Sequence, residues 1–382
     1  MLTEKAEKKF PCRYLGDITY WDKKFRGVSE RMQPSVIRHD HLEKGRLARL
    51  AEGSGNIALL FSNGDVMHSS SEKAEKLASE GEIVYIPWGG TPAVHYFRGK
   101  FVSGENRIAH VRDSSLINTR YLYYALLARI DRISECYRGG SLAHPDMNMM
   151  LHIEIPVPPL AVQKEIVESL DAFASLADEL EKEISLRKKQ FEICRSRLFS
   201  FDERNPLYDM IKKDVKKTEL KKAAKIINGK DRRVPEDYGD LPVYGSGGII
   251  SHDGGCLSSG PAVIIPRKGS ISNLFYSKGS CFCINTVFCV EPDSSILPKY
   301  LFYMLQDMHL ERFNTSGNVP TLTKKTVQSL LISVPSMEAQ KKTAEILDTL
   351  SPENSCTAIE KEIKERKKQF DILLHAMIGA DV

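Results

Sequence analysis

The chain has 382 residues, 42% of them hydrophobic, which suits two or three globular domains with cores of their own. The formal net charge is only +4, so a nucleic-acid surface would have to come from local clusters of Lys and Arg. The sequence has no run of eighteen apolar residues and its N-terminal stretch is polar and charged, so we expect no membrane span and no signal peptide.

The first globular domain is predicted to cover residues 1–158. Two apolar, β-branched stretches bounded by glycine, 81–87 and 101–111, are typical of strands. Residues 118–136 have apolar side chains at helical spacing and predict a helix. The prolines that follow, ending with Pro159, suit the start of a further helix. The pattern therefore predicts a mixed α/β domain.

A long helix is predicted for residues 159–200. Its apolar positions recur at alternating steps of four and three, which is the heptad seam of a helix that packs along another helix. At about 1.5 Å per residue it would be roughly 60 Å long, too long for one small domain, so we interpret it as a spacer. The predicted seam positions are Ile166, Leu170, Phe173, Ala177, Leu180, Ile184, Arg187, Phe191, Cys194 and Leu198.

A basic linker is predicted for residues 201–219, before a second globular domain at 220–335. Residues 211–225 contain seven lysines against only Asp214 and Glu219, the strongest basic cluster in the chain. The cluster is either a solvated helical face or a set of phosphate contacts, and the sequence leaves both readings open.

The second globular domain predicts the same kinds of elements as the first. Strands are expected at 262–266, 281–290 and 330–334, and a helix at 297–313. A second spacer helix is expected at 336–382. Its seam continues the same spacing through Ile359, Ile363, Arg366, Phe370, Leu373 and Met377.

An internal repeat relates the two halves. Matching stretches are Val157-Pro158 with Val334-Pro335, Gln163 with Gln340, 121–124 with 300–303, Asn106 with Asn285, and the Arg-Lys-Lys-Gln-Phe of 187–191 with that of 366–370. The offset changes by two residues near Ser351-Pro352, where a proline is expected to break or kink the second helix. The sequence therefore predicts two copies of one module, each a divergent globular part followed by a better-matched helix.

No self-contained catalytic centre is evident. Asn205-Pro206-Leu207-Tyr208 resembles the Asn-Pro-Pro-Tyr motif of amino-methyltransferases, but it lacks the second proline and no glycine-rich cofactor loop precedes it. Gly245-Ser246-Gly247-Gly248 lacks the Lys-Ser/Thr ending of a phosphate-binding loop. We interpret it as a tight turn that could approach a DNA backbone.

The cysteines predict free thiols and no metal site. There are eight, at no regular spacing, which is typical of a protein in a reducing cytoplasm. Cys256, Cys281, Cys283 and Cys289 with His252 contain no Cys-x₂-Cys pair, so buried free cysteines are the default expectation.

Residues suited to DNA contact are scattered through glycine-punctuated loops. Arg and Lys bond phosphates and guanine, hydroxyl groups bond either, and aromatic rings stack on bases. The first-domain candidates are Trp21, Lys23, Lys24, Arg26, Arg31, Ser69, Ser70, Trp88, Thr91 and Arg107. The second-domain candidates are Lys230, Arg232, Arg233, Tyr244, Ser246, Arg267, Lys268 and Ser270.

The duplicated order resembles the specificity subunit of type I restriction-modification systems. The stretches that carry the likeness are 155–159 with 163–167 and 188–191, their second copies, Leu241 to Gly248, and Trp21-Asp22-Lys23-Lys24-Phe25. The likeness covers essentially the whole chain.

The resemblance implies an α+β fold with two α/β target-recognition domains, separated by two long antiparallel coiled-coil helices with pseudo-two-fold symmetry. Each domain would read one half of a bipartite site in double-stranded DNA, and the helices would set the half-site spacing. Two methyltransferase (M) subunits and two motor-nuclease (R) subunits would be the partners. S-adenosylmethionine, ATP and Mg²⁺ would belong to those partners, with no cofactor and no catalysis in this cytoplasmic chain.

Two other functions are weighed against this one. A single-chain methyltransferase or nuclease would need cofactor or carboxylate motifs that the sequence does not show. A two-headed protein–protein scaffold would have no salt-dependent affinity for DNA, which a band-shift measurement tests.

Overall fold

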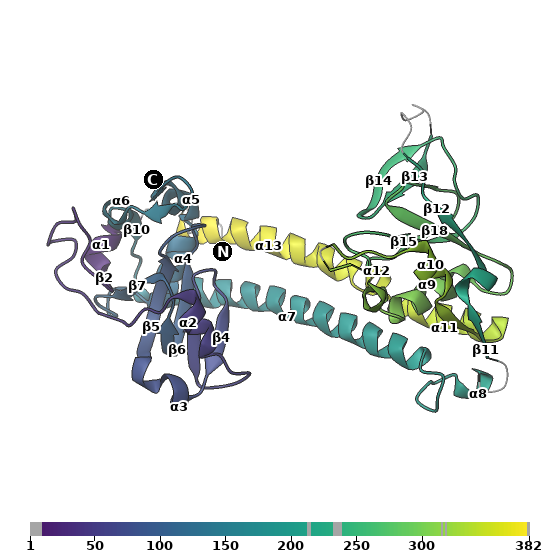
Figure 1. Cartoon of the computed structure of the whole chain (residues 1–382). Helices are drawn as coiled ribbons and strands as arrows, with labels where there is room; N and C mark the ends of the chain where they lie inside the picture. The colour runs from purple at the N-terminus through teal and green to yellow at the C-terminus, as the bar shows by residue number, and fades with distance from the viewer. Residues whose placement is uncertain (1–9, 212–214, 232–238, 315, 318, 380–382) are drawn as a thin grey trace. The chain divides into compact units, whose positions relative to one another are not determined.

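The computed structural model describes residues 10–211, 215–231, 239–314, 316–317 and 319–379. The chain forms two compact units, the first containing Met1–Glu179 with Glu362–Val382 and the second Leu180–Lys361. Each unit is described by itself (Figure 1), and the part of a unit outside the long helices is termed its head. In the part of the chain described, no helix is long and apolar enough to cross a membrane.

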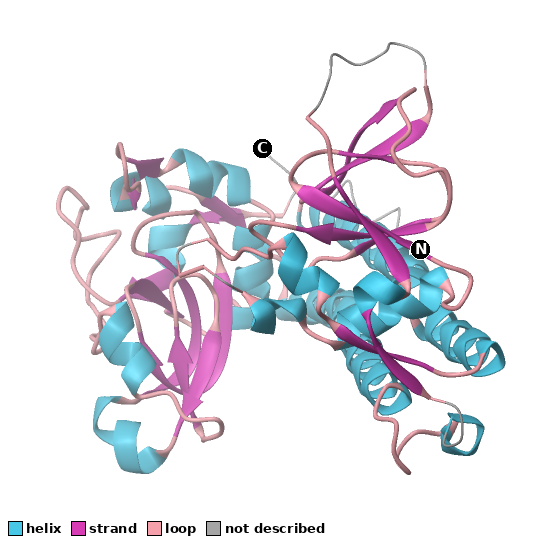
Figure 2. Ribbon diagram, turned by 45° about the vertical axis from the view of Figure 1, so that its right-hand side comes forward, coloured by secondary structure: helices cyan, strands magenta, loops and turns pink. Residues whose placement is uncertain are grey.

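The first head contains a six-stranded sheet in the order β2-β7-β5-β6-β3-β4. Strands are drawn in magenta in Figure 2. Its neighbours are antiparallel except β3 and β6, which are parallel. The strands are β2 (Thr19–Trp21), β3 (Ile57–Leu60), β4 (Val66–Ser69), β5 (Ser79–Pro87), β6 (His95–Ser103) and β7 (Asn106–Val111). Short pairs join β1 (Cys12–Tyr14) to β10 (Glu154–Pro156) and β8 (Tyr137–Arg138) to β9 (His144–Pro145). The helices are α1 (Leu15–Ile18), α2 (Lys44–Arg49), α3 (Ser71–Ala74), α4 (Thr119–Leu127), α5 (Ile130–Glu135) and α6 (Met147–Leu151).

The second head contains a four-stranded sheet, β12-β18-β15-β16, and a three-stranded sheet, β14-β13-β17. The strands are β12 (Ala224–Asn228), β13 (Leu241–Gly245), β14 (Gly248–Asp253), β15 (Ala262–Pro266), β16 (Phe275–Ser277), β17 (Phe282–Cys283) and β18 (Val287–Pro292). A separate antiparallel pair joins β11 (Lys216–Glu219) to β19 (Leu331–Val334). The helices are α8 (Tyr208–Ile211), α9 (Pro298–Asp307) and α10 (Lys324–Gln328).

Several predicted elements are confirmed and others are divided. The strands expected at 81–87 and 262–266 are β5 and β15. The stretch 101–111 is instead two strands, because the chain turns at Gly104, whose N–H bonds the carbonyl of Leu60 at 2.8 Å. The helix expected at 118–136 is divided into α4 and α5, and the helix expected at 297–313 ends as α9, followed by a short 3₁₀ turn.

The first spacer helix is α7 (Leu160–Leu198), with 39 residues. The second is interrupted, as its proline predicts. Helix α11 (Met337–Leu350) ends at Ser351, Pro352 opens the short α12 (Pro352–Ser355), and α13 (Thr357–Ile378) continues. Ser351 has extended backbone angles, because the residue before a proline is disfavoured in the helical region.

The predicted seams face the cores of both units. In the first unit Ile166 and Leu170 of α7 share one core with Leu374 and Ile378 of α13. In the second unit Phe191 and Leu198 share a core with Leu347 of α11. Among the predicted seam residues Leu170, Phe191 and Ile363 are buried, and Phe173, Leu180, Ile184, Arg187, Ile359, Arg366 and Phe370 are half-buried.

Arg187 contacts the second helix directly in the second unit. Its guanidinium donates to the carbonyl of Ser355 at 2.8 Å and pairs with Glu183 at 2.6 Å. Further along α7, Cys194 and Leu350 line one surface hollow. As the residue number rises along α7 from 187 to 194, the number of the neighbouring residue falls from 355 to 350, so the two segments are antiparallel within this unit. The Arg187 contact contributes to their register.

A buried glutamine ties the first head to α7. Gln163 is fully buried, and its side-chain oxygen accepts a hydrogen bond from the backbone N–H of Asn118 at 2.8 Å. Its amide donates to the carbonyls of Leu116 and Pro158 at 2.9 and 2.8 Å. Three backbone groups of the head therefore depend on this one side chain.

The second head is tied to α11 in the same way. Gln340, the repeat equivalent of Gln163, accepts from the N–H of Leu297 at 2.7 Å. Its amide donates to the carbonyls of Ser295 and Pro335, each at 3.0 Å. The repeated glutamine therefore marks a repeated junction.

An aromatic cage adds a second tie in the first unit. Arg120 of α4 donates to Asp171 of α7 at 2.8 and 2.6 Å. Its guanidinium lies 4.5, 5.0 and 5.1 Å from the ring centroids of Tyr96, Tyr123 and Tyr124. The hydroxyl of Tyr124 also donates to Asp171, at 2.5 Å, so charge, π-face and hydrogen bond act together.

The second unit repeats this cage with a lysine. The ammonium of Lys299 lies 3.0 Å from the carboxylate of Asp348. It lies 4.6, 5.8 and 5.5 Å from the ring centroids of Tyr276, Phe302 and Tyr303. Tyr303 donates to Asp348 at 2.5 Å, as Tyr124 does to its aspartate.

Candidate nucleic-acid interface

The candidate site of each head is the end of a buried strand at the same place in the repeat. Strands β5 and β15 each end in proline, and a turn follows each. The turns contain Gly90 and Gly269, with φ of +96° and +78°, backbone angles that glycine adopts without strain. The two turns thus present different side chains from similar backbone positions, Trp88 in the first head and Arg267 with Lys268 in the second.

In the first head a buried carboxylate organises the site. Asp22, directly after β2, has a side chain only 2% exposed and lies 3.5 Å from Arg107 of β7. The other carboxylate contacts are His41 Nε2 at 3.1 Å and the backbone N–H of Ile108 at 3.1 Å. Burial lowers the pKa of the Arg107 guanidinium, and the charge of Asp22 opposes that shift.

Trp88 lies above this ion pair. The Arg107 guanidinium is 5.1 Å from the centroid of its ring, and 42% of Trp88 is exposed. The peptide carbonyl of Trp88 bonds His144 Nδ1 at 2.9 Å, and Tyr137 donates to the carbonyl of Pro87 at 2.7 Å. The loop is therefore anchored while one aromatic ring stays open to stack on a base.

In the second head cations occupy the equivalent place. Arg267 donates to the carbonyl of Asn285 at 3.1 Å, and its guanidinium lies 5.0 Å from the ring centroid of Phe288. The side-chain amide of Asn285 donates to Asp231 at 2.5 Å. Lys230 and Lys268 are exposed beside this contact, in backbone bridges to Ile284 and Thr321. These side chains suit phosphate and guanine contacts.

Four predicted contact residues lie inside the protein, and their prediction is corrected. Trp21 is 1% exposed and packs in the first core, with its indole N–H donating to Thr19 at 2.9 Å. Ser69 is fully buried in β4, and Tyr244 is 6% exposed in β13. Arg107 is 7% exposed, so it supports Trp88 rather than reaching a base.

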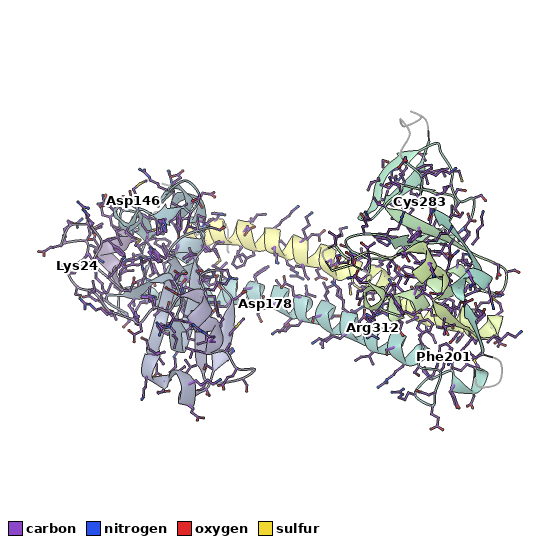
Figure 3. All side chains as sticks on the ribbon, viewed as in Figure 1. Lys24, Asp146, Asp178, Phe201, Cys283 and Arg312 are labelled. Carbon is purple, nitrogen blue, oxygen red and sulfur yellow. The ribbon has the colours of Figure 1, made fainter. Side chains whose placement is uncertain are left out.

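The other candidates are at or near the surface, and their contact with DNA stays a prediction. Lys24 (labelled in Figure 3) pairs with Glu30 at 3.7 Å, and Arg31 pairs with Asp17 at 3.2 Å. Lys23, Arg26, Thr91 and Ser270 are also exposed, while Ser70 and Ser246 are half-buried. Arg232 and Arg233 lie outside the described residues.

The basic cluster around the linker is not a helical face in its described part. Lys216 and Lys217 belong to strand β11, and a 3₁₀ turn contains Lys221 and Lys222. Lys221 pairs with Glu219 at 2.8 Å. The described lysines are exposed, so phosphate contact stays open as a prediction.

Sequence reasoning missed the polar residues that hold the first site. No local signal in the sequence links Asp22 and His41 to Arg107, because they are far from it along the chain and only the fold brings them together. Asn106 and Asn285 are detectable in the sequence, because they occupy equivalent positions of the internal repeat. Asn106 is fully buried and donates to the carbonyl of Leu60 at 3.0 Å, whereas Asn285 is exposed.

The fold and the repeated site define a two-headed chain of the type I specificity class. The model of the type I restriction modification DNA specificity domain matches residues 52–187 and 212–368, and the chain belongs to this family. A protein of Haemophilus influenzae that bears the name of a type I restriction enzyme specificity subunit is 26% identical over 84% of this chain and 89% of its own length. The EcoprrI specificity subunit of Escherichia coli is 29% identical over 60% of each chain.

Solved structures show the same fold. The S subunit of a type I restriction-modification system from M. genitalium superposes with a TM-score of 0.64 at 19% identity, covering 98% of each chain. A chain from a structural study of type I complex assembly gives a TM-score of 0.56 at 15% identity, over 98% of this chain and 100% of that one. The α+β architecture with two repeated heads and long helices is therefore that of S subunits.

Proposed function

We propose that this chain is the DNA-specificity subunit of a type I restriction-modification complex and that each head reads one half of a bipartite DNA site. The observation that carries the proposal is the combination of matched junctions with unlike surfaces. Gln163 and Gln340 make the same three contacts, whereas the strand-end turns present Trp88 in one head and Arg267 with Lys268 in the other. Two different half-sites require this arrangement.

Helix α7 carries the proposed spacer and docking role. Leu186 and Ile193 are 65% and 55% exposed on α7, and they are one heptad apart. Exposed apolar side chains on a helix suit a protein partner. Two methyltransferase subunits would bind there, and two motor-nuclease subunits would join them for restriction.

Catalysis would belong to those partners. S-adenosylmethionine would bind the methyltransferase subunits, and ATP with Mg²⁺ the motor-nuclease subunits, so this chain would supply only recognition, in the cytoplasm. The chain mixed with S-adenosylmethionine and DNA is expected to transfer no methyl group, and activity is expected once methyltransferase subunits are added. Methyl transfer by the chain alone would contradict this assignment.

A head exchange tests the proposal. Residues 1–158 are replaced by the corresponding head of another specificity subunit, and methylated positions are mapped across the host genome. One half of the recognised sequence is expected to change while the other half and the spacer length stay the same. A change in both halves, or in neither, would contradict the proposal. Replacing residues 220–335 is the matched control and is expected to change the other half only.

A further inference from the structure

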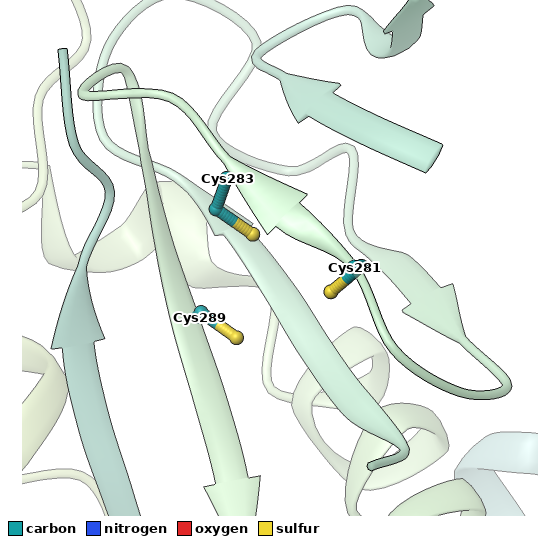
Figure 4. Close-up of side chains that lie close together, drawn as sticks. All are labelled: Cys281, Cys283 and Cys289. Carbon is teal, nitrogen blue, oxygen red and sulfur yellow. The ribbon is translucent and has the colours of Figure 1, made fainter. Parts of the chain in front are cut away.

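Three buried thiols converge inside the second head. Cys281 directly precedes β17, Cys283 ends it, and Cys289 lies in β18, which belongs to the other sheet (Figure 4). All three are fully buried, and their Sγ atoms lie within 4.8 Å of one another. The cluster thus links two sheets, a closeness that the linear spacing of the cysteines does not reveal.

The distances and donors fit a thiophilic metal ion. Zinc–thiolate bonds of about 2.3 Å in tetrahedral geometry place sulfur atoms roughly 3.8 Å apart. Sulfurs within 4.8 Å need only sub-ångström shifts to reach that spacing. Three thiolates are soft ligands, which select Zn²⁺ and Cu⁺ over Mg²⁺ and Ca²⁺.

Buried side chains enclose the cluster. Ser277 is 2% exposed, and its hydroxyl donates to the carbonyl of Gly279 at 3.0 Å. Apolar side chains that pack beside the cluster include those of Ala262 and Ile264.

The first head fills the positions equivalent to the three cysteines with residues that contain no sulfur. At the constant offset of the repeat, the first-head positions equivalent to the three cysteines are Val102, Gly104 and His110. The first two are buried and the third is half-buried. The sulfur trio is therefore particular to the second head rather than a need of the shared fold.

We propose that Cys281, Cys283 and Cys289 form a structural three-thiolate site for a thiophilic d¹⁰ metal ion, Zn²⁺ or Cu⁺. This departs from the sequence-based expectation of no metal, which rested on spacing alone. On binding, the thiols release their protons to solvent as the sulfur–metal bonds form. The ion joins β17 to β18 and so fixes the intervening segment, which contains Asn285.

The site also supports the second DNA surface. The carbonyl of Cys283 accepts the N–H of Lys230 at 2.9 Å, and the carbonyl of Asn285 accepts from Arg267 at 3.1 Å. Removing the ion is therefore expected to loosen the residues that present these cations. This consequence rests on the proposed function, whereas metal content can be measured without it.

The test uses the full chain, co-expressed with its methyltransferase partner and purified under reducing conditions without chelators. Elemental mass spectrometry is expected to find about one Zn²⁺ or Cu⁺ per chain, and the element identifies which ion is native. Cys283→Ser is expected to abolish this content. Cys136→Ser, which alters a buried thiol of the first head, is expected to leave it unchanged.

Because Cys283→Ser could unfold the head, a second measurement uses the wild-type chain. After metal removal, Zn²⁺ or Cu⁺ is expected to raise the Tm by roughly 5 °C or more, and Mg²⁺ to leave it unchanged. Cd²⁺ is expected to give a thiolate-to-metal absorption band. Absence of bound metal together with no Tm shift and no band would overturn the proposal, as would a disulfide within the trio in the reduced protein.

Discussion

The two heads are alike where they meet the helices and unlike where they present side chains outward. At the junctions, glutamine, aspartate and a caged cation recur, and even the tyrosine–aspartate bonds have the same length of 2.5 Å. At the strand ends the heads differ. The first head has a buried ion pair under Trp88, whereas the second has a cluster of Arg267, Lys230 and Lys268. The difference indicates that the attachment of a head is constrained while its recognition surface is free to diverge.

The aromatic cage contains Arg120 in the first unit and Lys299 at the equivalent position of the second, and this difference shows which properties of the junction are retained. Both side chains keep a cation between aromatic rings and an aspartate, although arginine makes two hydrogen bonds to its carboxylate and lysine only one contact. Charge and position are thus retained while the detailed bonding varies. A head can therefore be replaced if its junction residues are kept.

The largest effect is expected from Gln163→Leu. It leaves one N–H and two carbonyls of the first head without partners in a buried site, which is expected to cost about 4 kcal/mol of unfolding free energy. Both tryptophans of the chain, Trp21 and Trp88, lie in the first unit, so tryptophan fluorescence during denaturation measures this unit. Gln340→Leu is the matched variant, followed by hydrogen exchange. A loss in one unit only would break the equivalence of the junctions.

The next effect distinguishes the two strand ends. Asp22→Asn removes the charge that Arg107 and His41 contact in a buried place, which is expected to cost about 3 kcal/mol. Asp231→Asn in the second head is expected to change stability by less than about 0.5 kcal/mol, because that carboxylate is exposed. Denaturant unfolding of both variants measures the difference. Equal effects would show that the heads are organised alike after all.

Much of the fold follows from local patterns, whereas the site does not. Heptad spacing predicts α7, and Pro352 predicts the break between α11 and α13, since both signals lie within a few residues of their effect. The pairing of Asp22 with Arg107 depends on the register of β2 on β7, which no local signal contains. For the same reason the sequence predicts Trp21 as a DNA contact, although the strand turns its ring into the core.

The glutamines and the thiols show which contacts the internal repeat can predict and which it cannot. Gln163 and Gln340 were visible as repeat landmarks, because repetition preserves residues whose contacts are shared. The closeness of Cys289 to Cys281 comes from the packing of two sheets and has no counterpart in the first head, so the repeat gave no signal for it. Contacts within the shared scaffold can be read from duplication, and contacts particular to one head cannot.

Acid is expected to destabilise the first head more than the second. His39 Nε2 lies 2.9 Å from His110 Nε2, and burial lowers the pKa of His110 to about 4. The folded pKa is below the unfolded value, so the unfolded state binds more protons between pH 6.5 and 4, and stability falls as the pH falls through this range. The loss is expected to be about 2–3 kcal/mol. The position equivalent to His110 in the second head is Cys289, so this histidine pair has no counterpart there.

The measurement is tryptophan fluorescence during urea denaturation at several pH values, with His110→Phe as the control variant. The variant is expected to lose part of the pH dependence, because burial also lowers the pKa of His39 and of His95 and these two histidines remain. Hydrogen exchange of the second unit over the same range serves as the internal reference. An unchanged slope in the variant would assign the acid sensitivity to other groups.

The smallest effects concern DNA and separate stacking from charge. Trp88→Ala is expected to weaken binding by about 1–3 kcal/mol through lost stacking, with little change in its dependence on salt. Arg267→Ala is expected to weaken binding by a similar amount but to reduce the salt slope by about one, because a cation no longer displaces counterions. Each loss should appear only for DNA that retains the half-site read by the altered head. Binding of the assembled complex to DNA with one half-site scrambled, measured at several salt concentrations, checks both expectations. Equal slopes for the two variants would mean that the two heads contact DNA by the same chemistry, despite presenting an aromatic ring in one and a guanidinium in the other.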